Sequence, residues 1–164
     1  TILAPRHINR VNDIMSLCNK LNLKSQILSK DDKISNESEI IIINSFGVLH
    51  EYFRHAVSVF MGKSIIESKK NDSGQNPLDA AYLNCKVYHG PFVSNFTEIY
   101  EILKRNNISK EIRSYNELSK NLIIDFKNYK RKKINYSEPI KKLGQEVLFN
   151  TTRLIENFSD DKTS

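Results

Sequence analysis

A run of four isoleucines constrains the fold of this chain more than any other feature of its sequence. Residues 40–43 are all isoleucine, with no polar residue between them. A strand with one solvent-facing side alternates apolar and polar residues, so an unbroken run of this length indicates a strand covered on both faces. Strands of that kind are typical of a parallel sheet between two layers of helices.

The other apolar segments alternate between strand-like and helix-like patterns. Spacings of three and four residues predict amphipathic helices, and short apolar runs predict strands. We expect strands at 1–4, 27–28, 39–43, 56–61 and 86–89. We expect helices over 8–21, 48–55, 77–83, 95–107 and 118–129, and a terminal helix from 137. This order predicts an α/β fold, a Rossmann-like parallel sheet flanked by helices.

Local signals support several helix starts. Asn95 and Ser114 each stand three residues before a Glu, which is the spacing of a capping box. Asn76 precedes Pro77, a residue that is favoured in the first turn of a helix, so we expect Asn76 to be an N-cap.

The length is that of one domain. The chain has 164 residues and a mass of 19.0 kDa, enough to bury a core of its own. We expect that domain over 1–158, N-terminally truncated because the chain opens on a strand-like stub, with a disordered tail at 159–164. No window reaches the ~18 continuous apolar residues of a membrane span, so we expect this piece to be soluble.

The net charge of +6 and the pI of about 9.2 favour an anionic partner. A nucleotide, a nucleic acid and an acidic membrane surface all fit, and the residues 127–133 hold much of the positive charge. Cys18, Cys85 and the four histidines lack metal-ligand spacing. We therefore expect no metal and no cofactor, buried thiols, and histidines without a role in a site.

The turns that follow the strands are the candidate site, because ligands bind outside the carboxyl ends of parallel strands. Arg6 follows the first strand and offers a planar, permanently charged group to a phosphate. Residues 45–47 follow the isoleucine strand. Gly74 to Asp79 open a helix whose first amides and dipole favour phosphate, while the Asp79 carboxylate suits ribose hydroxyls. Asn76 and Asp79 fit an ordinary cap and first-turn acid equally well.

Five of these segments, in the same order along the chain, resemble a known family. They are Ala4–His7, Asn44–Gly47, Phe60–Ser64, Gly74–Ala81 and Gly90–Ile99. Together they are similar to the transferases of 3-deoxy-D-manno-octulosonic acid (Kdo), which have two facing Rossmann-like domains in the GT-B arrangement. The resemblance implies that this chain is the C-terminal, CMP-Kdo-binding domain. It assigns CMP contacts to Pro5, Arg6, Phe46, Gly47, Val48, Asn76, Pro77, Leu78 and Asp79.

The resemblance also implies a function. The parent enzyme would be a glycosyltransferase of lipopolysaccharide biosynthesis that moves Kdo from CMP-Kdo to the lipid A precursor lipid IVA, at the cytoplasmic face of the bacterial inner membrane. Its general base, acceptor site and membrane contact are expected in an N-terminal domain, so we expect no catalytic residue and no activity in this chain alone. Val48, Lys63 and Gln75 stand where the family usually has Glu, Gly and His.

Two other functions stay open on the sequence. One is a GT-B domain for a different nucleotide sugar, because a phosphate site at a helix start does not read the base. The other is a basic nucleic-acid-binding module. Its expected stacking platform is missing from the pattern, since the aromatic residues are spaced for packing. We therefore expect no nucleic-acid partner.

Overall fold

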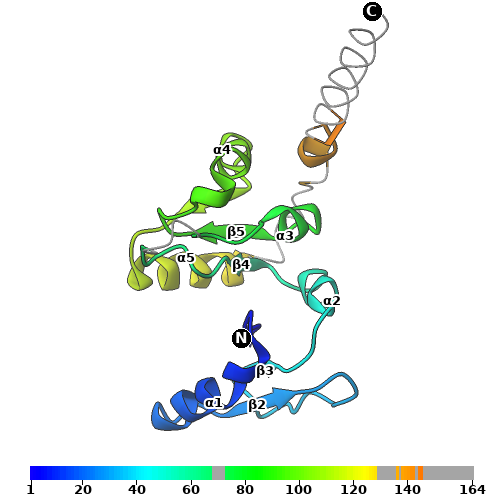
Figure 1. Ribbon diagram of the computed structural model, residues 1–164, viewed down its shortest axis with the longest axis vertical. Coiled ribbons are helices and arrows are strands. Elements are labelled where there is room, and N and C mark those ends of the chain that lie inside the picture. The colour runs from blue at the N-terminus through cyan, green and yellow to red at the C-terminus, as the bar shows by residue number, and fades with distance from the viewer. Residues whose placement is uncertain (68–72, 129–135, 137, 143, 146–164) are drawn as a thin grey trace, which may run out of the picture. The chain divides into compact units, whose positions relative to one another are not determined.

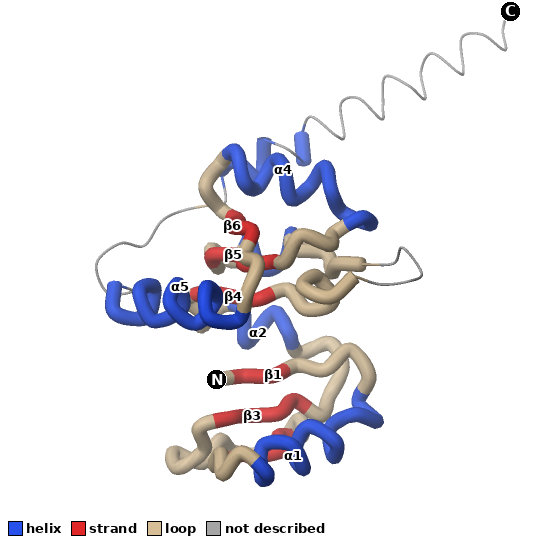
Figure 2. The backbone as a smooth tube through the Cα atoms, turned by 90° about the vertical axis from the view of Figure 1, so that its left-hand side faces the viewer, coloured by secondary structure: helices blue, strands red, loops and turns tan. Residues whose placement is uncertain are grey.

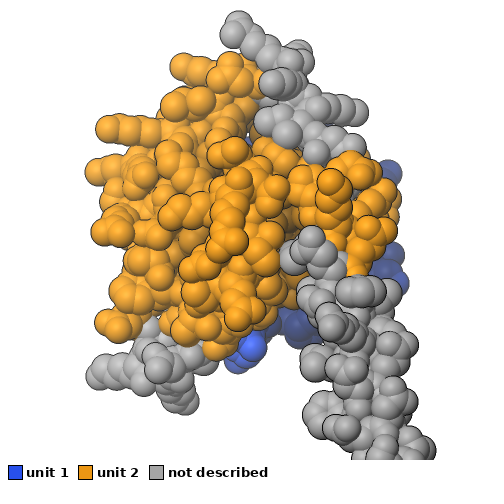
Figure 3. All heavy atoms as spheres, turned by 90° about the horizontal axis from the view of Figure 1, so that it is seen from above, with its two compact units in different colours: residues 1–49 blue, residues 50–164 orange. Residues whose placement is uncertain are grey.

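The structure is a computed structural model. It describes residues 1–67, 73–128, 136, 138–142 and 144–145. Contacts divide the chain into two compact units, Thr1–Leu49 and His50–Ser164 (Figure 3). The sequence pattern predicts one domain over 1–158 and shows no sign of this division. The expected tail at 159–164 and most of the expected terminal helix lie outside the described residues.

Unit 1, residues 1–49, is built on a parallel sheet of three strands. Their order is β1-β3-β2, so the isoleucine strand β3 lies in the middle. The elements are β1 (Ile2–Leu3), the 3-10 helix η1 (Ile8–Arg10), α1 (Val11–Lys20), β2 (Ser25–Leu28) and β3 (Ile40–Ile43). Ile42 is fully buried and packs with Val11 and Cys18 of α1. Ile41, Ile42 and Ile43 are all buried, which confirms that β3 is covered on both faces.

Unit 2, residues 50–164, contains a second parallel sheet of three strands, in the order β4-β5-β6 (Figures 1 and 2). Its strands are β4 (Ser58–Phe60), β5 (Lys86–His89) and β6 (Ser109–Glu111). Its helices are α2 (Leu49–Phe53), which begins at the boundary, α3 (Leu78–Tyr82), the 3-10 helix η2 (Ser94–Phe96), α4 (Thr97–Arg105) and α5 (Tyr115–Asn128). β6 was not predicted, because Ser-Lys-Glu carries no apolar strand signal.

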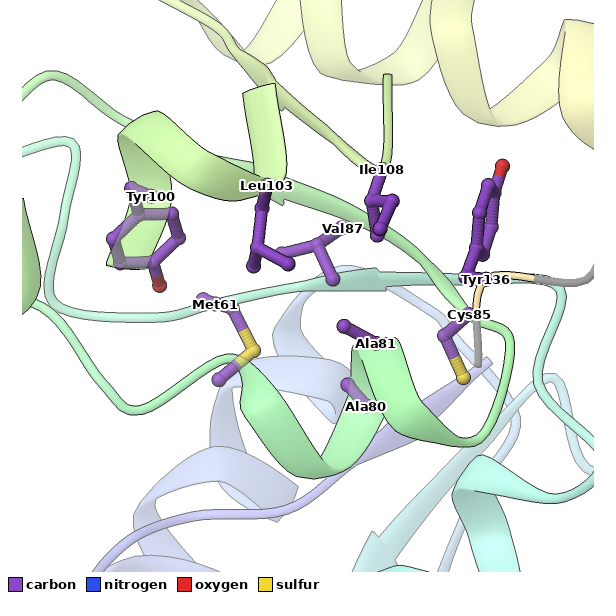
Figure 4. Packing of buried hydrophobic residues seen from close by; sticks show 9 residues of the cluster. All are labelled: Met61, Ala80, Ala81, Cys85, Val87, Tyr100, Leu103, Ile108 and Tyr136. Carbon is purple, nitrogen blue, oxygen red and sulfur yellow. The ribbon is translucent and has the colours of Figure 1, made fainter. Parts of the chain in front are cut away.

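The core of unit 2 lies between β5 and its covering helices (Figure 4). Val87 of β5 is fully buried, as are Ala80 and Ala81 of α3. Tyr100 and Leu103 of α4 join the same cluster. The small alanine side chains allow a helix to approach a strand closely, and the larger residues of α4 fill the remaining space. Cys85 belongs to this core, and Cys18 is buried in unit 1, so the expected burial of both thiols is confirmed.

The helix starts follow the sequence signals in part. The Ser114 hydroxyl accepts a hydrogen bond from the Glu117 amide at 3.2 Å, which confirms a side-chain cap at α5. The Leu78 amide donates to Asn76 Oδ1 at 3.0 Å, which confirms the cap expected at α3. The capping box predicted at Asn95 is wrong. A 3-10 turn, η2, replaces it, and α4 starts after Phe96 without a side-chain cap.

Asp125 fastens α5 to the sheet of unit 2. Its carboxylate accepts hydrogen bonds from Tyr88 Oη at 2.6 Å, Ser58 Oγ at 2.7 Å and Lys86 Nζ at 3.0 Å. The Asp125 side chain is only 12% exposed. Burial raises the pKa of Asp125, but the three hydrogen bonds outweigh it, and the pKa lies below its ordinary value. The ionised carboxylate therefore stabilises the fold.

We predict that Asp125→Asn lowers the free energy of unfolding by about 2 kcal/mol at neutral pH, because it weakens hydrogen bonds to a charged acceptor. A carboxyl whose folded pKa is depressed stabilises the fold above its unfolded pKa, and this stabilisation is lost as the pH falls through the folded pKa. The difference between wild type and variant should therefore shrink below about pH 4. Urea unfolding at a series of pH values measures it.

The control is Glu98→Gln, which removes an exposed acid of α4 in the same unit. It should change the stability of the fold by less than about 0.5 kcal/mol. A difference for Asp125→Asn that is small, or that stays constant down to low pH, would contradict the role given to the carboxylate.

Candidate functional site

Two of the predicted turns lie at the same edge of the unit 1 sheet. β1 and β3 pair in parallel, with Ile2 opposite Ile41 and Leu3 opposite Ile42. The carboxyl ends of both strands therefore point the same way. Pro5 and Arg6 follow β1, and residues 46–48 follow β3. Parallel pairing thus places five of the nine residues predicted to contact CMP at one edge of the sheet.

The unit 1 turns present their side chains to solvent. Arg6 is exposed, Phe46 is 74% exposed, and Val48 is half-buried. Gly47 has a φ of +77°, which favours glycine, although a β-carbon there would meet no atom within 4 Å. The backbone conformation, and not crowding, therefore explains the glycine. The turn leaves its surface open for a ligand.

In unit 2, the turn before α3 is held in place on two sides. The Gly74 amide donates to the Lys63 carbonyl at 2.8 Å, and Tyr100 Oη donates to the Gln75 carbonyl at 2.8 Å. Gly74 has a φ of +90°, and a β-carbon there would lie 3.1 Å from Val93 Cα. Burial raises the pKa of Tyr100, so its hydroxyl remains a donor at neutral pH. The backbone that leads into residues 76–79 is thus fixed before any ligand binds.

The predicted residues of this turn differ in exposure. Pro77 is buried, Leu78 is half-buried, and Asn76 and Asp79 are exposed. α3 has only five residues, so its dipole is smaller than the sequence argument assumes. Because the Asn76 side chain already caps the Leu78 amide, that amide is not free for phosphate. The side chains of Asn76 and Asp79, more than the N-terminus of α3, are therefore the groups of this turn that a ligand can contact.

Sequence reasoning missed His50. Its Nε2 lies 3.8 Å from Asp79 Oδ1, with both side chains more than half exposed. The sequence predicts no role for this histidine, and its distance from Asp79 along the chain leaves no local pattern to find. His50 stands within reach of a ligand that contacts Asp79.

A buried serine joins the turns after β4 and β5. Ser64 Oγ donates to the Met61 carbonyl at 2.6 Å and accepts from the Gly90 amide at 2.9 Å. The Ser64 carbonyl accepts from the Phe92 amide at 2.9 Å. A β-carbon on Gly90 would overlap the backbone of Ser64 and Ile65. The close approach of two turns explains why Gly90 is glycine.

His89 lies next to this junction, at the end of β5. It is 4% exposed, and its ring centre lies 4.2 Å from that of Tyr100. Burial lowers the pKa of His89 and outweighs its hydrogen bond to the Gly90 carbonyl, which favours a neutral ring at neutral pH. That carbonyl only accepts, so Nδ1 donates across 2.7 Å. Nε2 is buried and has no hydrogen-bond partner among the described residues.

A small surface pocket of about 220 Å³ lies beside the turn after β5. It is lined by Glu67, Ser73, Pro91, Phe92, Val93, Ser94 and Thr97. None of the nine residues predicted to contact CMP is among these lining residues. Because the structure defines the two units separately, the expected meeting of Arg6 with Asn76 in one anion pocket stays a prediction.

Gly90→Ala tests the junction between the two turns. The added β-carbon must displace backbone, so we expect the free energy of unfolding to fall by about 2–3 kcal/mol. Gly62→Ala is the matched control, because a β-carbon at Gly62 meets no atom of the described residues within 4 Å. Urea unfolding of both variants measures the difference. Equal stabilities would show that the turns do not approach as closely as described.

Comparison with known proteins supports the resemblance drawn from the five segments. No protein-family model matches the chain. The Kdo transferase of Rickettsia felis is 28% identical over 162 residues, 94% of this chain. That of Haemophilus influenzae is 23% identical over 159 residues, 97% of this chain. The chain is related to the Kdo transferases.

The fold agrees with this relationship. The C-terminal CMP-Kdo binding domain of WaaA from Acinetobacter baumannii matches with a TM-score of 0.75 and 21% identity. The match covers 88% of this chain and 72% of that domain. The predicted α/β fold, with parallel sheets flanked by helices, is confirmed. The chain spans 34% and 35% of the two Kdo transferases, about a third of their length.

Proposed function

We propose that this chain is the donor-binding part of a Kdo transferase, which transfers Kdo from CMP-Kdo to a lipid A precursor. The observation that carries the proposal is the match of almost the whole chain to Kdo transferases, together with the fold of a CMP-Kdo binding domain. The described α/β units supply the turns that such a donor needs. Catalysis then requires residues outside the third of the Kdo transferases that this chain matches.

The residues proposed for CMP divide by chemistry. The Arg6 guanidinium is exposed and permanently charged, so it suits the single phosphate of CMP. Pro5 fixes the chain just before it, and the open turn at residues 46–48 offers backbone and apolar contacts. On the other unit, the Asp79 carboxylate suits ribose hydroxyls, and Asn76, Pro77 and Leu78 shape the surface beside it.

Because α3 is short, it contributes less to phosphate binding than the side chains do. A five-residue helix with a capped first turn contributes little to phosphate binding. Arg6 therefore supplies most of the attraction for the phosphate in this proposal. Because Asp79 repels anions, it is suited to the sugar hydroxyls and not to the phosphate.

The acceptor and the location belong to the same proposal. A lipid A precursor is carried by the inner membrane, so the enzyme would act at the cytoplasmic face of that membrane. Among the described residues, no helix has the length and apolar content required to cross a bilayer. The proposal therefore needs contact between the enzyme and the membrane surface.

Calorimetric titration with CMP tests the donor site. Arg6→Gln should weaken CMP binding by about tenfold or more, because a charge-assisted hydrogen bond is lost. Asp79→Asn keeps the shape of the side chain and should weaken CMP binding by several-fold. Arg10→Gln is the control, since Arg10 is an exposed arginine of the same unit outside the predicted turns.

The choice of nucleotide tests the substrate class. CMP should bind more tightly than UMP or ADP at equal concentration. Binding that prefers UMP or ADP would replace CMP-Kdo with another nucleotide sugar. Unchanged CMP affinity in Arg6→Gln would remove Arg6 from the donor site.

A further inference from the structure

α5 (Tyr115–Asn128) has two contrasting faces. Its inner face holds Leu118, Leu122 and Asp125, at i, i+4 and i+7, and these side chains are partly buried. The hydrogen bonds of Asp125 to Ser58 and Lys86 place this face against β4 and β5. Figures 1 and 2 show α5 running beside these strands. The opposite face is therefore turned away from the sheet.

The outward face carries both apolar and basic side chains. Lys120, Ile123, Ile124 and Lys127 stand at i, i+3, i+4 and i+7, so they form one continuous stripe. We call these four residues the outer stripe. Ile123 is 52% exposed and Ile124 is 56% exposed, and both lysines are exposed. Covering these two isoleucines with an apolar partner would remove apolar surface from water, which is favourable.

The charge of the outer stripe has one sign. Of the two acidic residues of α5, Asp125 lies on the inner face, while Glu117 stands one turn before Lys120, next to the outer stripe. The Glu117 carboxylate accepts from the Arg113 amide at 3.0 Å. The chemistry of the stripe therefore complements a surface that is both apolar and anionic.

We infer that the outer stripe of α5 docks on an anionic lipid bilayer. The isoleucines enter the boundary between headgroups and acyl chains, as on helices that lie in the membrane plane. The lysine stems lie along the apolar region while their ammonium groups reach the lipid phosphates. The inference deepens the proposed function, because a lipid-linked acceptor lies at such a surface, but it requires no nucleotide.

Flotation of the whole chain with vesicles tests the inference. The two probes are vesicles of phosphatidylcholine alone and vesicles of phosphatidylcholine mixed with phosphatidylglycerol, both without nucleotide. We expect flotation with the mixed vesicles only. Replacing both lysines, Lys120→Gln with Lys127→Gln, should weaken partitioning by roughly tenfold or more, since each basic residue near an anionic surface contributes about fivefold. Replacing both isoleucines, Ile123→Ser with Ile124→Ser, should abolish flotation.

Matched controls lie at the C-terminal end of α1 and in the loop after β2. Leu17→Ser with Leu21→Ser removes two exposed apolar residues of unit 1. Lys20→Gln with Lys30→Gln removes two exposed lysines of unit 1. Both control pairs should float like the wild type. Circular dichroism melting of every variant shows whether the fold is kept.

Each outcome decides the inference. Loss of flotation in folded stripe variants, with both controls unchanged, supports it. No flotation of the wild type, equal flotation with neutral vesicles, or equal loss in the controls overturns it. In those cases the stripe would be a surface for another polypeptide. Since no nucleotide is present, a failure here leaves the CMP titration of the proposed function unaffected.

Discussion

Parallel strand pairing is the constraint on which the rest of this structure depends. β3 lies between β1 and β2, and β5 lies between β4 and β6, with each neighbouring pair parallel. Parallel strands deliver their following turns to the same edge of a sheet. In each unit, residues far apart in sequence therefore meet at one edge. This pairing determines the edge of each sheet at which the turns proposed to contact CMP lie.

The fold was predictable where burial leaves a strong pattern. The isoleucine run predicts β3, and Lys86–His89 matches β5 in full. β6 could not be predicted, because an edge strand of Ser-Lys-Glu owes its conformation to hydrogen bonds from β5 and not to its own residues. The division after Leu49 was also missed, since it depends on which residues contact each other and not on local composition.

The candidate site was predictable as turns but not as contacts. Glycines at φ values of +77° and +90° mark Gly47 and Gly74 as special backbone positions, and both lie in segments picked from the sequence. The supports of those segments come from distant parts of the chain. Tyr100 holds the Gln75 carbonyl, and His50 lies beside Asp79. The result is a rigid backbone in unit 2 with exposed polar side chains on it, which suits a small polar ligand.

Nuclear magnetic resonance titration of the ¹⁵N-labelled chain with CMP shows which turns contact the nucleotide. We predict that the amide signals of Arg6, Gly47 and residues 76–79 (Pro77 has no amide hydrogen) shift together with one dissociation constant. Shifts confined to the pocket around Phe92 and Thr97, or to α5, would contradict it. So would shifts in the turns of only one unit.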